Sequence, residues 1–369
     1  MVCSHFGNCG ACNNYKLEYN EQLNKKKELV STLLKNFNKE LKVFSTPTNA
    51  HRARAEFKIW HEDNKIYYAL TNLEKNGVVK LKECPKVVES INSVMWDLIK
   101  KIEQKDILKN KLFAIEFLGS TSSKDLLVTL IYHKSLDDSW QKEAKELEKA
   151  FNISLIGRAR KQKIALSKEY ITQKFNIDNK EYIYRYYEGG FTQPNPFINQ
   201  KMIEWVVSKV KNIGGDFLEC YCGLGNFTIP LSQYFNRVLA TEISKSSIKN
   251  AKINCELNSI DNIDFIRLNS KETAQALKKV REFNRLKGIN LDSFNFTTAL
   301  VDPPRAGLDT DTINLIKEFK NIIYISCNPK TLSRDLKELS KTHKIKDAAI
   351  FDQFAYTNHI ESGVYLERV

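Results

Sequence analysis

The sequence predicts an α/β protein, with a doubly wound, mostly parallel sheet in the second half of the chain and an α+β domain in the first half. Three observations lead to this prediction. The chain has 369 residues, which is more than one hydrophobic core usually holds. Strand and helix patterns alternate regularly from about residue 198 onward, as they do in parallel sheets. The first half mixes helix and strand patterns without that regularity and without a repeat.

The first half contains both helical and strand periodicities. Apolar residues at helical spacing predict helices over about residues 23–37, 91–102 and 136–147. Runs of β-branched and aromatic residues predict the strands Glu56–Trp60, Ile66–Leu70, Leu112–Leu118 and Leu126–Tyr132. We expect these elements to form one domain over residues 1–185.

The second half follows a strand–helix rhythm. The predicted strands are Asp216–Tyr221, Arg237–Thr241, Ile263–Leu268, Thr298–Val301 and Ile322–Ser326, with two final strands near Ile350 and Val364. Helices are predicted over about residues 202–210 and from Ser244 and from Lys330. Tyr186–Gly190 precedes a proline-rich segment that does not suit a helix interior, and we expect a second domain over residues 186–369. Ligands of such sheets bind at the carboxyl ends of the strands.

Composition excludes several classes of protein. Apolar residues make up 42% and charged residues 27%, which argues against global disorder. No run of about 18 uncharged apolar residues predicts a membrane span, and the first residues do not resemble a secretory signal. We therefore expect a cytoplasmic protein, in which the eight cysteines serve as thiols, metal ligands or catalysts rather than as disulfides.

Positive charge is concentrated in the first half. Residues 1–180 hold 32 Lys and Arg against 22 Asp and Glu, whereas residues 181–369 hold 25 against 22. This distribution favours a first domain that binds a polyanion and a second that performs chemistry. The alternative is that lysine serves only solubility.

A glycine-rich turn follows the first predicted strand of the second half. Gly223 and Gly225 allow a ligand to approach the backbone closely, and Glu242 follows 19 residues after Gly223, at the end of the next strand. A carboxylate at that position can accept hydrogen bonds from both ribose hydroxyls of a nucleoside. The pattern predicts a nucleoside cofactor, with a purely structural turn as the alternative.

Three further strand ends carry reactive residues. Asp302 ends a strand before two prolines that hold the loop extended. Cys327 follows the next strand, where a nucleophile is favoured over a buried thiol because this edge of the sheet also carries the other motifs. Glu361 precedes the last strand and is a candidate general base, although an isolated glutamate is usually a surface residue.

Together these motifs resemble the RNA uracil-C5-methyltransferase family, over essentially the whole chain. The matching segments of the second half are Phe191–Asn199, Glu219–Phe227, Val301–Leu308, Tyr324–Pro329 and Phe351–Gly363. In the first half, Arg52–Trp60 resembles the branch that forms ribothymidine in the T-loop of tRNA. The resemblance implies an S-adenosylmethionine-dependent methyltransferase fold with an N-terminal RNA-binding domain.

The resemblance also implies roles for individual residues. Cofactor contacts are expected from Gln193, Tyr221, Asn226, Glu242 and Asp302. Cys327 is the expected nucleophile and Glu361 the expected proton acceptor. The implied reaction moves a methyl group from S-adenosylmethionine to C5 of the uridine at position 54 of tRNA, through a covalent bond between Cys327 and C6 of the base.

The implied partner is tRNA with its target base flipped out, because a stacked base cannot reach a buried sulfur. Arg52, Arg54 and Lys58 suit phosphate contacts, while Phe57 and Trp60 either stack on bases or pack in the core. Other T-loop-like RNAs are further candidates, and we expect a monomer. One alternative is the same reaction on 23S rRNA. Another is a non-catalytic RNA-binding or tRNA-folding protein.

The N-terminal cysteines resemble the iron–sulfur segment of the ribosomal-RNA branch. The expected metal ligands are Cys3, Cys9, Cys12 and Cys84. Four thiolates suit a [4Fe–4S] cluster or a tetrahedral zinc ion. The resemblance favours the cluster, and zinc or no metal are the alternatives. The cysteines expected to be core thiols are Cys220, Cys222 and Cys255.

Overall fold

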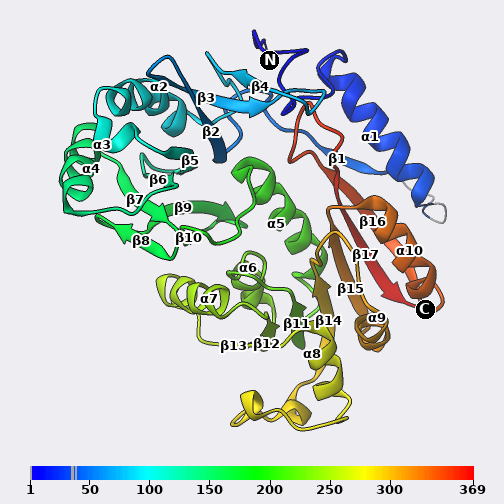
Figure 1. Ribbon diagram of the computed structural model, residues 1–369. Helices are drawn as coiled ribbons and strands as arrows, with labels where there is room; N and C mark the ends of the chain where they lie inside the picture. The colour runs from blue at the N-terminus through cyan, green and yellow to red at the C-terminus, as the bar shows by residue number, and fades with distance from the viewer. Residues whose placement is uncertain (1, 35–36, 38–39) are drawn as a thin grey trace.

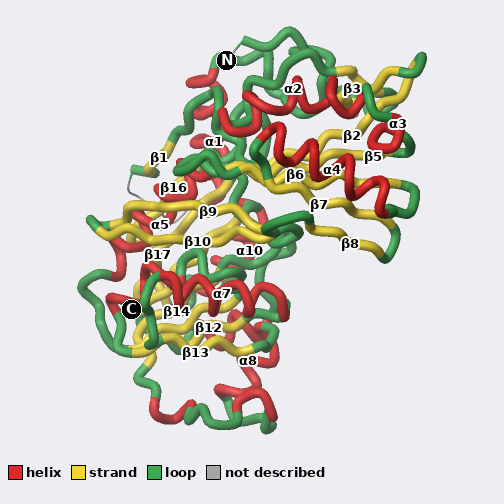
Figure 2. The backbone as a smooth tube through the Cα atoms, turned by 90° about the vertical axis from the view of Figure 1, so that its left-hand side faces the viewer, coloured by secondary structure: helices red, strands yellow, loops and turns green. Residues whose placement is uncertain are grey.

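Two β-sheets and a β-hairpin between them form the protein (Figure 1, Figure 2). The computed structural model describes residues 2–34, 37 and 40–369. The α/β class and the mostly parallel sheet of the second half are confirmed. Of the predicted helix over residues 23–37, the part at 35–36 lies outside the described residues.

The N-terminal sheet is antiparallel except between β6 and β7. Its strands are β2 (Arg54–Glu62), β3 (Lys65–Thr71), β4 (Val78–Lys80), β5 (Leu112–Gly119), β6 (Leu126–Tyr132), β7 (Ser154–Ala159) and β8 (Gln162–Ala165), in the order β4-β3-β2-β5-β6-β7-β8. The helices are α2 (Glu89–Glu103), α3 (Asp106–Lys109) and α4 (Asp138–Phe151). The apolar face of α2 packs into the same buried core as the sheet.

The C-terminal sheet carries the sequence motifs. Its strands are β11 (Asp216–Cys220), β12 (Arg237–Thr241), β13 (Ile263–Ile266), β14 (Phe296–Val301), β15 (Asn321–Ser326), β16 (His343–Phe351) and β17 (Glu361–Arg368), and β1 (Lys42–Phe44) adds an edge strand. The order is β1-β16-β17-β15-β14-β11-β12-β13. Only β17 runs antiparallel to its neighbours among these described strands.

Helices connect the strands of this sheet. They are α5 (Pro196–Val210), α6 (Thr228–Leu231), α7 (Lys245–Leu257), α8 (Ser270–Leu277), α9 (Thr310–Ile316) and α10 (Pro329–Leu339), with short 3₁₀ turns at Ser232–Tyr234, Asn284–Leu286 and Leu291–Ser293. Asn195 caps α5 and Asn328 caps α10, each followed by a proline in the first turn.

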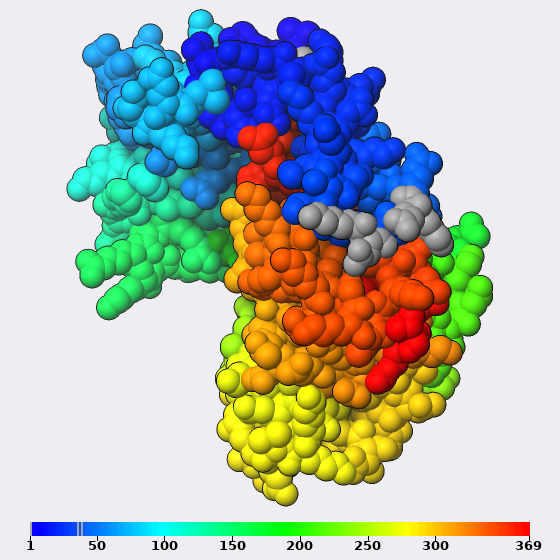
Figure 3. All heavy atoms as spheres, turned by 90° about the vertical axis from the view of Figure 1, so that its right-hand side faces the viewer, coloured from blue at the N-terminus to red at the C-terminus, as the bar shows by residue number. Residues whose placement is uncertain are grey.

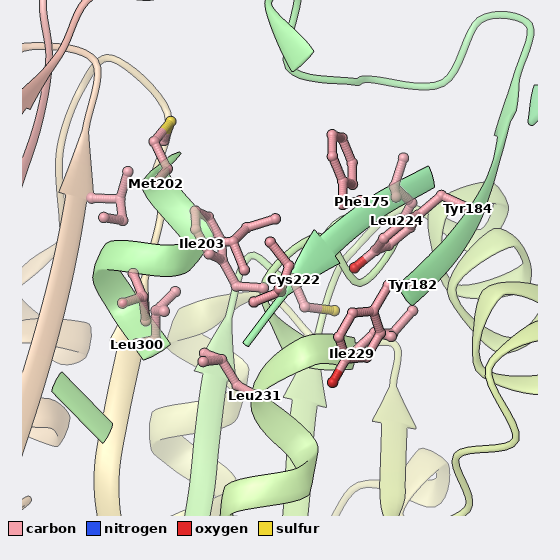
Figure 4. Close-up of a cluster of buried hydrophobic side chains, with 14 of the residues drawn as sticks. Phe175, Tyr182, Tyr184, Met202, Ile203, Cys222, Leu224, Ile229, Leu231 and Leu300 are labelled. Atoms are coloured by element: carbon pink, nitrogen blue, oxygen red, sulfur yellow. The ribbon is translucent and has the colours of Figure 1, made fainter. Parts of the chain in front are cut away.

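The hairpin of β9 (Tyr170–Ile177) and β10 (Lys180–Tyr187) shares a core with the C-terminal sheet. Figure 4 shows Tyr184 of the hairpin in one cluster with Ile203, Cys222 and Leu300. The proposed domain boundary between residues 185 and 186 falls within β10. The same core also contains Leu118, Leu127 and Ile156 of the N-terminal sheet, so the hairpin packs against both sheets.

Residues from the start of the chain also pack on the C-terminal half. β1 pairs in parallel with β16, which the sequence analysis did not predict, and α1 (Tyr19–Leu33) lies beside α10 and β16. Figure 3 shows N-terminal residues seated against the C-terminal segments. The two halves of the sequence are thus interleaved in space.

A buried ion pair fastens α1 to the loop after β16. Lys26 Nζ lies 2.6 Å from Asp352 Oδ1 and also donates to the carbonyl of Phe354. The Tyr19 hydroxyl donates to Asp352 Oδ2 at 2.6 Å. Both side chains of the ion pair are at least 95% buried, so each charge depends on the other for compensation.

Lys26→Ala should lower the free energy of unfolding by about 3 kcal/mol, because it leaves the Asp352 carboxylate buried without its cation. Urea-induced unfolding followed by circular dichroism measures the change. The matched control is Lys27→Ala, whose ion pair with Glu40 is solvent-exposed and should change stability by less than about 0.5 kcal/mol. Equal losses in the two variants would contradict the assignment.

Candidate active site

A cavity of about 420 Å³ lies at the carboxyl ends of β11, β12 and β14. It is lined by all five residues predicted to contact a cofactor: Gln193, Tyr221, Asn226, Glu242 and Asp302. In sequence these residues extend from Gln193 to Asp302. The sheet brings them to one edge, as expected for a doubly wound fold.

The glycine-rich turn forms one wall of this cavity. Gly223 and Gly225 have φ of +57° and +87°, and a Cβ on Gly225 would lie 2.9 Å from the Ile229 side chain. Glycine is therefore required for this close turn. The Glu242 carboxylate accepts hydrogen bonds from the backbone N–H of Gly223 at 3.2 Å and of Ser244 at 2.8 Å, which fix it against the turn.

Amide and hydroxyl groups hold the other lining residues. Asn226 and Asn199 exchange side-chain hydrogen bonds of 2.9 and 2.8 Å. Gln193 accepts a hydrogen bond from the Gln353 side chain at 3.1 Å. The Tyr221 hydroxyl donates to the hydroxyl of Ser270 at 2.7 Å. The cavity wall is thus a hydrogen-bonded surface and not a set of independent side chains.

Two carboxyl groups line this cavity, Glu219, which is buried, and Asp302, which is partly buried. Burial raises the pKa of Asp302 to about 7. It also raises the pKa of Glu219 to about 8, with a smaller contribution from Asp302. Among the described residues, Oε2 of Glu219 has no hydrogen-bond partner. Glu219 is not among the site residues predicted from the sequence, although a carboxylate inside an apolar strand end is a signal that could have identified it.

Cys327 and Glu361 lie at the same end of two neighbouring strands, β15 and β17. The last pair of the β15–β17 ladder is Ser326 with Ser362. Cys327 directly follows β15 and Glu361 begins β17, so both residues flank this last pair, and the charge of Glu361 acts on Cys327. Cys327 is partly exposed and Glu361 is only 7% exposed. The predicted nucleophile and proton acceptor are therefore adjacent at the sheet edge that carries Asp302.

The electrostatics of this pair oppose ionisation. Burial raises the pKa of Cys327 to about 11, with further contributions from Glu361 and Asp302 and an opposing one from Arg305. The pKa of Glu361 lies well above its usual range, because of burial and then Asp302, while Arg305 again opposes the shift. Cys327 is thus a thiol at neutral pH, and the surroundings of Glu361 disfavour its ionised form.

The four N-terminal cysteine candidates come together. Cys3, Cys9, Cys12 and Cys84 line one cavity of about 30 Å³, which Lys86 also lines. Within residues 2–34, 37 and 40–369, however, no group of three or more His, Cys, Asp or Glu side chains is arranged as a metal-ion site. The remaining cysteines, Cys220, Cys222 and Cys255, are buried.

The basic residues predicted to contact phosphates do not share one environment. Arg54 is held by Glu116 at 2.6 Å and by the carbonyl of Gly190. Lys58 is exposed. Phe57 lies in the core and contacts Tyr68 and Phe117, so it cannot stack on RNA.

Trp60 is 42% exposed, so its indole ring is accessible from solvent. Arg52 lies with its guanidinium 5.9 Å from the Phe354 ring.

With this geometry defined, comparison with known proteins identifies the family. The sequence profile of a family described as tRNA (Uracil-5-)-methyltransferase matches residues 18–369. The chain belongs to the tRNA (uracil-5-)-methyltransferase family. The match confirms the predicted enzyme class and leaves the segment that holds Cys3, Cys9 and Cys12 outside the matched range.

Two relatives of this family member align along the full length of both chains. The tRNA/tmRNA (uracil-C(5))-methyltransferase of Sulfurovum sp. (strain NBC37-1) is 56% identical over 371 residues and covers 100% of each chain. The protein with the same description from Nitratiruptor sp. is 51% identical, also with 100% of each chain covered.

A solved structure confirms the methyltransferase fold. The tRNA (uracil-54, C5)-methyltransferase of Pyrococcus abyssi, in complex with S-adenosyl-L-homocysteine, matches with a TM-score of 0.73 at 22% identity. The match covers 95% of this chain and 84% of that one. In the part of the chain that the structure describes, no helix is both long enough and apolar enough to cross a membrane.

Asp302→Asn should stabilise the protein at alkaline pH only. The pKa of Asp302 is raised to about 7 in the folded state, whereas in the unfolded chain it is near 4. The stability that comes from the neutral carboxyl is therefore complete below about pH 4 and is lost as the pH rises through about 7.

The asparagine cannot ionise, so at about pH 8.5 the variant should exceed the wild type by at least about 1 kcal/mol in free energy of unfolding. At about pH 5 the difference should be much smaller. Urea titrations at the two pH values measure this change, and a pH-independent difference would exclude titration of Asp302 as its cause.

Proposed function

We propose that this chain transfers a methyl group from S-adenosylmethionine to C5 of a uridine in tRNA, at position 54 of the T-loop, giving 5-methyluridine. The observation that carries the proposal is the position of Cys327 and Glu361 at the same end of the β15–β17 ladder, next to its last pair, Ser326 with Ser362. The same edge of the sheet forms the cavity. Relatives described as tRNA/tmRNA (uracil-C(5))-methyltransferases support the substrate.

The cavity suits S-adenosylmethionine for reasons of charge and shape. Glu242 stands beside the glycine turn, where a ribose would find an acceptor for its hydroxyls. Glu219 is buried and Asp302 is partly buried, and no ion pair among the described residues includes either carboxyl group. A cationic ligand would compensate these carboxylates. When bound, S-adenosylmethionine supplies an electrophilic methyl group on a sulfonium.

Cys327 makes the uracil ring reactive. The C5 carbon of uracil is a weak nucleophile. When the Cys327 thiolate forms a bond to C6, the electron pair of the C5–C6 double bond moves toward O4, and the resulting enolate is nucleophilic at C5. C5 can then take the methyl group, which leaves Cys327 bonded to C6 and a proton still on C5.

Glu361 completes the reaction in this proposal. Its carboxylate accepts the proton from C5, the C5–C6 double bond re-forms, and the electron pair of the C–S bond returns to the sulfur of Cys327. Because Glu361 is 7% exposed, little water competes for this step. The raised pKa of Glu361 makes the ionised form a stronger base than a glutamate in water.

RNA binding is assigned to the basic first half. A uridine in folded RNA reaches Cys327 only when its base leaves the stack, at a cost of a few kcal/mol that phosphate contacts can offset. Arg52 and Lys58 are the candidates for these contacts, since Arg54 is already held by Glu116. Trp60 is exposed and is available to stack on a base.

The decisive experiment gives labelled S-adenosylmethionine to the enzyme with tRNA or 23S rRNA that lack the modification. Methyl incorporation should map to uridine 54 of tRNA. Cys327→Ala should lower the rate at least about a thousandfold, because the covalent step is lost. Glu361→Gln should accumulate a covalent RNA–protein adduct, because release needs the base.

Cys255→Ala is the matched control, since it removes a buried thiol that no step uses, and it should keep most of the activity. Substantial turnover by Cys327→Ala would refute the covalent mechanism. Methylation of 23S rRNA alone would refute the substrate.

We also propose that Cys3, Cys9, Cys12 and Cys84 hold a [4Fe–4S] cluster. Their convergence on one cavity supports this proposal. The positive charge of Lys86 beside them would offset thiolate charge. When bound, the cluster would tie the N-terminal segment to the first domain.

Protein purified without oxygen should therefore contain iron and acid-labile sulfide, near four of each per chain, together with visible absorbance. Cys12→Ser should lose most of the iron, whereas Cys255→Ser should keep it. Stoichiometric zinc without sulfide would refute the cluster and support the zinc alternative. Colourless, metal-free protein would refute both the cluster and the zinc ion.

A further inference from the structure

Arg305 connects the two loops that carry the proposed catalytic pair. It follows the Asp302–Pro304 stretch at the carboxyl end of β14. Its backbone carbonyl accepts a hydrogen bond from the Asn328 side chain at 3.1 Å and one from the Thr331 hydroxyl at 3.4 Å. Asn328 is the residue directly after Cys327, so the backbone of Arg305 is fixed beside the nucleophile.

The side chain of Arg305 is held from the other direction. Its Nη2 lies 2.8 Å from Nδ1 of His359, which precedes Glu361 by two residues. The His359 ring packs 5.3 Å from the Phe354 ring. A guanidinium can only donate, so Nδ1 must be the acceptor and the imidazole must be neutral. Arg305 thus spans the gap between the Cys327 loop and the start of β17.

Conditions around His359 favour that neutral form. Burial lowers the pKa of His359, and four cations add to the effect: Arg305, Lys26, Arg52 and Lys86. These cations come from four separate parts of the chain. A protonated His359 would lose its acceptor for Arg305, so the same surroundings preserve the hydrogen bond that orients the guanidinium.

The charges that act on Cys327 are unbalanced without Arg305. Glu361 of β17 and Asp302 of the β14 loop both disfavour negative charge on the sulfur. Among the described residues, Arg305 is the cation that favours negative charge on the Cys327 sulfur. Arg305 also favours the ionised form of Glu361. Both groups must be negative at some step of the proposed reaction, and this one cation favours the negative form of each.

We propose that Arg305, oriented by His359, is the counter-ion that stabilises the Cys327 thiolate. Ionisation breaks the Sγ–H bond, leaves the electron pair on sulfur and releases the proton to solvent. His359 is a positioning residue, since it acts through Arg305. The inference rests on the proposed function for the use made of the thiolate, while the ionisation itself can be measured without any substrate.

The test is the pH dependence of Cys327 alkylation by iodoacetamide in the full chain, without RNA or S-adenosylmethionine. Mass spectrometry of the Cys327 peptide follows the rate, which tracks the thiolate fraction. Arg305→Gln should move the midpoint up by about one pH unit. This is at the low end for an adjacent charge because Arg305 is exposed. The rate below the midpoint should fall about tenfold.

Conservative variants separate charge from shape. Arg305→Lys keeps the charge and should shift the midpoint by less than half as much as Arg305→Gln. His359→Ala removes the acceptor and should move the midpoint in the same direction as Arg305→Gln, whereas His359→Gln, whose amide oxygen can accept, should restore part of the shift. The matched control Lys330→Gln removes another exposed cation near the start of α10 and should leave the midpoint unchanged.

An unchanged midpoint in Arg305→Gln would overturn the inference, as would an equal shift in Lys330→Gln. Near-ultraviolet circular dichroism confirms that each variant is folded. Because the measurement uses no RNA and no cofactor, its outcome is independent of whether the chain methylates tRNA. A failure of methylation with a shifted midpoint would therefore count against the proposed function alone.

Discussion

The antiparallel pairing of β15 with β17 is the constraint on which the site depends. Parallel strands place their carboxyl ends at one edge, and β15 delivers Cys327 there. Because β17 runs the other way, its first residue lies at the same edge, and that residue is Glu361. In an all-parallel sheet the start of β17 would lie at the opposite edge. A slip of one residue would turn Glu361 to the other face of the sheet.

The loop that leads into β17 is held by residues from the other end of the chain. Besides the Lys26–Asp352 ion pair, the Lys86 side chain donates to the carbonyl of Ala355 at 3.0 Å, and the backbone N–H of Asn14 donates to the carbonyl of Tyr356 at 3.0 Å. The segment that holds Cys3, Cys9 and Cys12 is therefore followed directly by a contact with the loop that precedes Glu361. The N-terminal residues and the sheet edge that holds Cys327 and Glu361 are therefore joined by direct hydrogen bonds.

Local sequence patterns predicted the features that depend only on residues close together in the sequence. The core strands, the glycine turn and the residues at strand ends follow from periodicity and from the rule that parallel strands end together. Three features depend on tertiary contacts and were missed. The edge strand β1 is only three residues long, the burial of Glu219 arises from distant neighbours, and the engagement of Arg54 requires Glu116 from another strand.

The edge position of β1 has a consequence for how the protein is made. Residues 42–44 pair with residues 349–351, so a ribosome releases this strand about three hundred residues before its partner exists. Contacts of such long range close late and slow folding. During synthesis the early strand has an open edge, which is a surface that other chains can join.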